Sequence, residues 1–202
     1  MTLIVIATLT ACSSHFEASR NEPSRGIWGN DTYTNQYLGL TFRLPEEWTI
    51  TCDDDISALL GLSSDEDEFI EPGEYVPYYY WEGNPVFIDM IANDPFLGVG
   101  IIIMYEQLTF PYGGVSEPEH IKNTLEYIAN TNMSAYTVDD TVQIGKYLWY
   151  SYINKIMTRE GVVVMRNFIN IQGNIVRTIS FTYNEVIDPV DDLLGYFTTV
   201  KQ

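Results

Sequence analysis

Residues 146–183 read KYLWYSYINKIMTREGVVVMRNFINIQGNIVRTISFTY, and this segment predicts a series of strands. It is rich in aromatic and β-branched residues, which favour strands, and two turn-forming pairs break it, Glu160-Gly161 and Gly173-Asn174. Tight turns between strands join neighbours that run in opposite directions. We therefore expect an antiparallel meander of three strands, at about residues 146–156, 161–171 and 174–183.

Other segments predict further strands and three helices. The clearest helix begins at Ser116, which can form a capping box with Glu119. A shorter helix, capped by Asp53 or Asp54, is expected to end at Gly61. Additional strands are expected at about residues 37–44, 86–92, 98–105 and 136–144. A last helix should begin at Asp188-Pro189 and bury a stripe made of Val190, Leu193, Leu194 and Phe197.

These elements predict an α+β fold, a mostly antiparallel sheet with helices packed on its faces. The chain has 202 residues, enough for one large domain. Its 46% hydrophobic and 14% aromatic residues indicate a folded protein, since disordered acidic chains are poor in aromatics.

The negative charge is concentrated in one block. The chain has a formal net charge of −18, and the segment between Arg43 and Lys122 holds 17 of its 28 carboxylates and no Lys or Arg. Nucleic acid is excluded as a partner, because phosphate binding needs clustered Lys and Arg. The block is either a set of solubilising acidic loops or an acidic face that meets a cationic partner.

The N-terminus has the pattern of a secretory signal. Residues 1–11, MTLIVIATLTA, form an apolar run too short to span a bilayer as a helix. The segment Leu9-Thr10-Ala11-Cys12 resembles the lipobox of bacterial lipoprotein precursors, although the usual preceding positive charge is missing. That resemblance implies cleavage between Ala11 and Cys12 and a fatty-acid anchor on Cys12. The protein would then be held at the extracytoplasmic face of the cell membrane. The alternative is an N-terminal core strand with an incidental cysteine.

A polar tether is expected at residues 12–27, followed by a single domain at 28–202. Residues 13–26, SSHFEASRNEPSRG, have the composition of a flexible linker. The only other cysteine, Cys52, would have no intramolecular partner if Cys12 is lipidated, and we expect it to be half-buried.

Residues 33–48, YTNQYLGLTFRLPEEW, resemble the opening of PsbP-like domains. Those domains begin with an aromatic-Gly-apolar strand, a proline and a tryptophan. Lipoproteins of low-GC Gram-positive bacteria look similar over nearly the whole chain, with signal, tether, this motif, central helix, meander and terminal helix in the same order. The resemblance implies a PsbP-like α/β/α sandwich and carries no function, because proteins of this fold do unrelated things.

The sequence contains no recognisable catalytic or cofactor motif. A nucleophile elbow, a P-loop, a dinucleotide fingerprint and a zinc-type His/Cys cluster are all missing. Of the two histidines, His15 lies in the tether and His120 is expected on a helix surface. The acidic runs at 53–55 and 65–68 lack the spacing that wraps a calcium ion. We therefore expect no enzyme activity, no cofactor and no metal.

An aromatic cluster inside the acidic block is the candidate binding surface. It comprises Tyr78, Tyr79, Tyr80 and Trp81. Consecutive strand residues point to opposite faces, so one set belongs to the core and the other can be exposed. Exposed aromatics among carboxylates suit a cationic peptide, a protein or a sugar. Otherwise the cluster covers a sheet edge.

The resulting hypothesis is a lipid-anchored extracytoplasmic binding or accessory module. The alternatives are an envelope-acting hydrolase that uses paired carboxylates and a purely structural envelope protein. Two carboxylates facing a deep pocket would favour the hydrolase, and a broad acidic and aromatic face would favour the binding module.

Overall fold

The alternating and β-branched segments form long antiparallel strands. The structure, a computed structural model, describes residues 23–52, 55–56, 79–81, 84–109, 114–131, 133–159 and 161–200. The strands of the main sheet, with their bounds, are β4 (Thr49–Ile50), β5 (Tyr79–Trp81), β6 (Asn84–Asp94), β7 (Val99–Gln107), β8 (Met133–Ile144), β9 (Tyr147–Thr158), β10 (Gly161–Gln172) and β11 (Ile175–Asn184). The predicted meander is confirmed, and β8 extends it to four strands.

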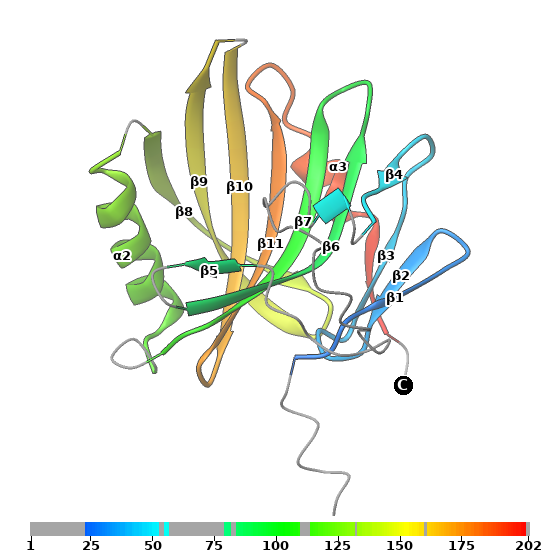
Figure 1. Ribbon diagram of the computed structural model, residues 1–202, viewed down its shortest axis with the longest axis horizontal. Helices are drawn as coiled ribbons and strands as arrows, with labels where there is room; N and C mark the ends of the chain where they lie inside the picture. The colour runs from blue at the N-terminus through cyan, green and yellow to red at the C-terminus, as the bar shows by residue number, and fades with distance from the viewer. Residues whose placement is uncertain are drawn as a thin grey trace, which may run out of the picture.

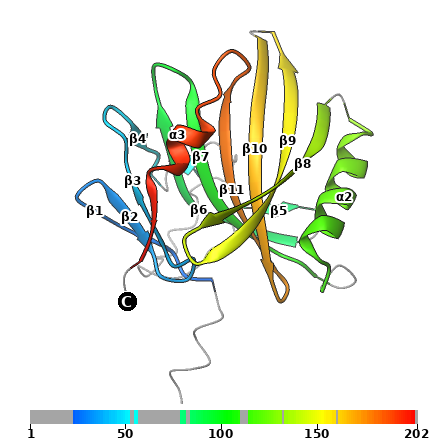
Figure 2. The same ribbon diagram turned by 180° about the vertical axis from the view of Figure 1, so that it is seen from behind.

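The described residues form two sheets. The large sheet has the order β4-β6-β7-β11-β10-β9-β8, and β5 pairs with β6 away from this path. The small sheet has the order β1-β2-β3-β12. Its strands are β1 (Ile27–Gly29), β2 (Thr32–Asn35), β3 (Leu40–Arg43) and β12 (Phe197–Thr199). In Figures 1 and 2 the small sheet lies next to the large sheet, and buried residues of both sheets form one core.

The predicted α+β class with a mostly antiparallel sheet is confirmed. Helix α2 (Glu117–Ile128) packs on one face of the large sheet, here called the outer face. The short helix α3 (Val190–Leu194) packs with the small sheet against the inner face (Figure 2). The sequence predicted helices on the faces of the sheet. The structure shows in addition a four-stranded sheet, which lies with α3 on the inner face.

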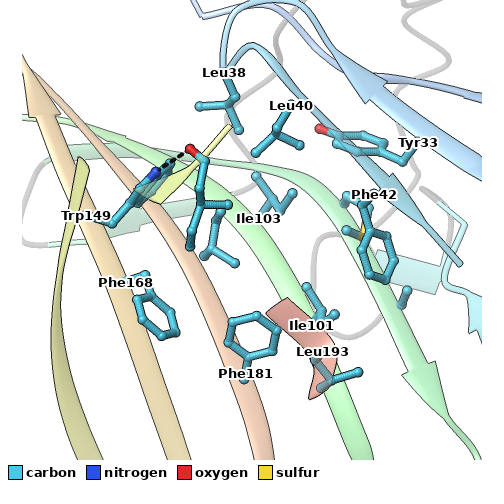
Figure 3. Packing of buried hydrophobic residues seen from close by; sticks show 14 of the residues in the cluster. Tyr33, Leu38, Leu40, Phe42, Ile101, Ile103, Trp149, Phe168, Phe181 and Leu193 are labelled. Carbon is cyan, nitrogen blue, oxygen red and sulfur yellow. Dashed lines mark hydrogen bonds between the residues drawn. The ribbon is translucent and has the colours of Figure 1, made fainter. Parts of the chain in front are cut away.

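The main core lies between the two sheets. Phe168 and Phe181 of the large sheet make an edge-to-face contact with ring centroids 5.6 Å apart. Figure 3 shows them facing the side chains of the small sheet, with Leu193 of α3 beside them. The fully buried Trp149 donates a 2.9 Å hydrogen bond from Nε1 to the carbonyl oxygen of Ile144, which satisfies its only polar atom.

Two details differ from the sequence predictions, and a third prediction cannot be compared. The strand expected at 37–44 begins only at Leu40, because residues 36–39 form a turn that Gly39 permits with a φ of +62°. The last helix ends at Leu194, and Phe197 lies in β12, paired with Phe42. The short helix predicted up to Gly61 lies mostly outside the described residues.

Candidate functional site

A cavity of about 310 Å³ lies between α2 and the outer face of the large sheet. Helix α2 is fixed there by Ile121, which packs with Leu108 and Tyr152, and by the buried Ile128. The apolar residues that line the cavity are Val86, Met104, Leu108, Val115, Ile128 and Met133.

The first turn of α2 is held by a contact that differs from the predicted capping box. Ser116 is the N-cap residue, but its side chain makes no capping hydrogen bond. Glu117 instead accepts a 3.0 Å hydrogen bond at Oε1 from the backbone N–H of Ile171 in β10. This bond ties the helix to the sheet at one end of the cavity.

One carboxylate, Glu106 on β7, lines the described part of the cavity. Asn84 on β6 donates a 2.8 Å hydrogen bond from Nδ2 to its Oε1. The Asn84 amide is itself oriented, because its Oδ1 accepts from the backbone N–H and the hydroxyl of Thr109 at 2.9 and 2.7 Å. The paired carboxylates of the hydrolase alternative are therefore not formed by the described lining residues.

Two titratable side chains of the cavity are kept neutral by burial. His120, expected on a helix surface, is half-buried and lines the cavity, and burial lowers the pKa of its imidazole. Burial, and then the nearby charge of Glu106, raise the pKa of the Tyr152 hydroxyl above its usual range. At neutral pH both groups are uncharged hydrogen-bonding partners.

Asn154 on β9, a residue of the cavity lining, has a buried side-chain atom without a partner. Its Oδ1 atom makes no hydrogen bond and has almost no accessible surface, so it lies behind the cavity wall. Buried acceptors of this kind are rare, and an unpaired one destabilises the protein. A donor in the cavity would reach this atom after a rotation of the Asn154 side chain.

A buried carboxylate on the inner face, Asp89, links the two sheets. The register of β6 against β7 shifts between Ile88 and Met90, so Asp89 sits in a bulge. Its Oδ1 accepts from the backbone N–H of Gly26 at 2.9 Å. Its Oδ2 accepts from the Tyr33 hydroxyl and from Asn35 Nδ2, the latter at 2.7 Å.

Burial has the largest effect on the pKa of the Asp89 carboxyl group. It raises the pKa of Asp89 above the usual range of an aspartate, and the hydrogen bonds from Tyr33, Gly26 and Asn35 oppose that shift in part. The fully buried arrangement leaves no opening for a substrate, so we assign it a structural role. Nothing in the sequence singles out Asp89, because its position in the strand pattern does not reveal the bulge.

The buried guanidinium group of Arg177 lies between two aromatic rings. The guanidinium carbon of Arg177 lies 4.4 Å from the ring centroid of Tyr37 and 4.1 Å from that of Tyr147. It donates to the amide oxygens of Asn170 and Gln172. In the described part of the chain no carboxylate pairs with it, so stacking and amide contacts stabilise its charge.

The candidate binding surface is described only in part. Tyr79–Trp81 forms β5, which pairs with β6 so that Tyr79 lies opposite Val86 and Trp81 opposite Asn84. Both β6 residues line the cavity. In Figure 1, β5 lies between α2 and the centre of the sheet. Tyr78 and the orientation of the aromatic side chains lie outside what the structure describes, so the surface stays a prediction.

The other predicted sites have different outcomes. Ala11 and Cys12 lie outside the described residues, as does the acidic run at 65–68. Cys52, expected to be half-buried, is exposed, with Sγ 3.0 Å from Oδ2 of Asp55.

Two features are absent from the described residues. No three His, Cys, Asp or Glu side chains there are grouped so that they could hold a metal ion. No helix in these segments combines the length and apolar character needed to cross a membrane.

A comparison with protein-family models finds no match, and neither does a comparison with the curated proteins. Two solved structures are similar to the chain. A crystal structure of a protein from Bacteroides thetaiotaomicron has 14% sequence identity and a TM-score of 0.41; the match covers 81% of this chain and 46% of that one, so this chain spans about half its length. The solution structure of cyanobacterial PsbP (CyanoP) from Synechocystis sp. PCC 6803 has 10% identity and a TM-score of 0.45, with 86% of this chain and 98% of that one covered.

Proposed function

We propose that this protein is a non-enzymatic binding or accessory module that takes a small ligand in the cavity between α2 and the outer face of the large sheet. The observation that carries the proposal is a cavity of about 310 Å³ whose mostly apolar lining includes one carboxylate, Glu106, oriented by Asn84. Ligand pockets combine a mostly apolar wall with a few convergent polar groups, and this cavity has both.

The neighbouring aromatic strand supports the same location. The backbone of β5 pairs with the two β6 residues at the edge of the cavity, Asn84 and Val86. A ligand in the cavity would therefore lie beside residues 78–81, the aromatic segment that the sequence predicts to be a binding surface. The proposal thus joins a surface expected from composition with a cavity found in the fold.

The proposal includes an anchor at Cys12. It rests on the lipobox-like segment Leu9-Thr10-Ala11-Cys12 and on the polar stretch that follows it. Two acyl chains hold a protein stably on a membrane, whereas one is marginal. A diacylglyceryl group on Cys12 would hold the domain at the outer face of the cell membrane, with the cavity accessible to extracytoplasmic ligands.

A cavity-blocking variant tests the binding role. Asn123 is exposed on α2 and lines the cavity, so Asn123→Trp should fill its mouth without disturbing the core. The neighbouring Lys122 has a side chain that is 74% exposed and does not line the cavity, so Lys122→Trp is the matched control. Both variants and the wild-type full chain are screened against one fragment library by ligand-observed NMR.

We expect a set of fragments that bind the wild type and Lys122→Trp and no longer bind Asn123→Trp. Fragments that bind all three proteins alike, or a wild type that binds none, would contradict a ligand site beneath α2.

A further inference from the structure

Resting on the proposed binding role, we propose that the cavity beneath α2 selects a compact organic cation, an ammonium group attached to a small apolar body. The ammonium would lie between Glu106 and Asn154, and the apolar body would lie against Val86 and Leu108.

The charge of the lining favours a cation. Glu106 contributes a carboxylate, and among the described lining residues there is no Lys or Arg. His120 adds no positive charge at neutral pH, because burial lowers the pKa of its imidazole. The net charge of the described lining is therefore negative, in a partly enclosed space where a charge interaction is stronger than in water.

The hydrogen-bonding groups also match an ammonium, which has three donors and no acceptor. Asn154 adds a buried acceptor without a partner, which a rotation of its side chain would bring to the ammonium. Asn84 holds Oε1 of Glu106 through a 2.8 Å hydrogen bond, so the carboxylate is oriented before a ligand arrives. The Tyr152 hydroxyl, kept neutral by burial, supplies a further oxygen.

The size of the cavity limits the ligand. About 310 Å³ lies at the lower end of the range for small-molecule pockets. The apolar wall, with Val86, Leu108 and Ile128, takes a body of about one ring or a short alkyl chain. A long peptide or a polysaccharide chain would not fit inside.

Three probes of the same shape separate charge from size. Benzylamine is cationic at pH 7, benzyl alcohol is neutral and benzoate is anionic. Their dissociation constants for the wild-type full chain are measured by NMR titration, with Asn123→Trp used to identify binding in the cavity. We expect benzylamine to bind about tenfold more tightly than benzyl alcohol, the fold-change expected for one charge-assisted hydrogen bond, and benzoate to bind most weakly.

Two variants identify the groups responsible. Glu106→Gln keeps the shape and the acceptor for Asn84, so it should remove the preference for benzylamine while leaving benzyl alcohol unchanged. Asn154→Ala removes the unpartnered acceptor and should weaken benzylamine a few-fold. The control Glu119→Gln removes an equal charge from an exposed position of α2 outside the cavity and should change nothing.

The outcomes separate this inference from the binding role. Equal binding of the three probes in the cavity, or tightest binding of benzoate, would overturn the cation preference and leave the binding role intact. A preference for benzylamine that persists in Glu106→Gln would also overturn it. If none of the probes binds in the cavity, the cation site fails, and the fragment screen with Asn123→Trp decides the binding role separately.

Discussion

Asn84 on β6 donates a 2.8 Å hydrogen bond to Glu106 on β7 while its own oxygen accepts twice from Thr109. The two acceptor contacts orient the amide, because only one orientation places its oxygen toward Thr109 and its nitrogen toward Glu106. One buried side chain thus connects the strand beside β5, the cavity carboxylate and the end of β7.

Replacement of Asn84 should therefore destabilise the fold. Asn84→Ala removes three hydrogen bonds from a side chain that is 5% exposed, and we expect the free energy of unfolding to fall by about 2 kcal/mol. Urea denaturation measures the change. Asn123→Ala, at an exposed helix position, is the control and should not destabilise, since alanine favours helices. An Asn84→Ala variant as stable as the wild type would show that these bonds do not hold the site.

Asp89 predicts a pH-dependent stability. Its pKa is raised in the folded state by burial, so folding favours the protonated form. Below about pH 4 the group is protonated in both states, and its contribution to stability is fully present. As the pH rises through the raised folded-state pKa, the folded state loses the proton and that contribution is lost.

Asp89→Asn should abolish this part of the pH dependence. We expect the free energy of unfolding of the wild type, measured by urea denaturation from pH 4 to 8, to decline with pH more than that of the variant. Glu126→Gln, at an exposed position of α2, is the matched control and should keep the wild-type slope. Identical slopes for wild type and Asp89→Asn would show that the carboxyl has the same pKa in both states.

Because Arg177 stacks between two rings, we expect that a positive charge alone at this position cannot maintain the stability of the protein. Arg177→Lys keeps the charge but loses the planar group that stacks between Tyr37 and Tyr147 and reaches two amide oxygens. We expect a loss of about 2 kcal/mol in the free energy of unfolding. Arg43→Lys, at an exposed position, should change it by less than about 0.5 kcal/mol. Equal stabilities of the two variants would refute the role of the stack.

The proposed lipid anchor on Cys12 predicts a labelling pattern in a bacterial host that processes lipoproteins. Cys12→Ala should lose incorporation of a fatty-acid probe and move the protein from the membrane to the soluble fraction. Cys52→Ala removes the only other cysteine, which is exposed in the structure, and should keep both properties. Labelling that survives in Cys12→Ala would exclude a lipid on that residue.

The strands could be predicted from the sequence because their signals are local. The pairs at Glu160-Gly161 and Gly173-Asn174 separate long β-branched runs, and the meander follows from short turns. The small sheet could not be predicted, because β3 and β12 lie more than 150 residues apart and pair only once the chain has folded. Phe197 fits a helical stripe by spacing, yet its contacts with Phe42 and Phe181 place it in a strand.

The cavity could not be predicted from the sequence, for a different reason. Glu106 is one acid among 28, and nothing in its neighbours indicates that Asn84 orients it. His120 has the surroundings of a surface residue, with Glu119 beside it, and only the packing of α2 on the sheet buries it. The aromatic segment singled out by composition forms β5, which pairs with β6 beside the cavity, and its role as a binding surface stays a prediction.

Binding of a small organic cation between α2 and the large sheet can be measured by a two-dimensional NMR titration of the isotope-labelled full chain with benzylamine. We predict saturable shift changes that are largest at the backbone amides of Glu106, Asn123 and Asn154, which come from three different elements and all line the cavity. Shift changes confined to the small sheet, or no saturable change at any residue, would contradict the claim.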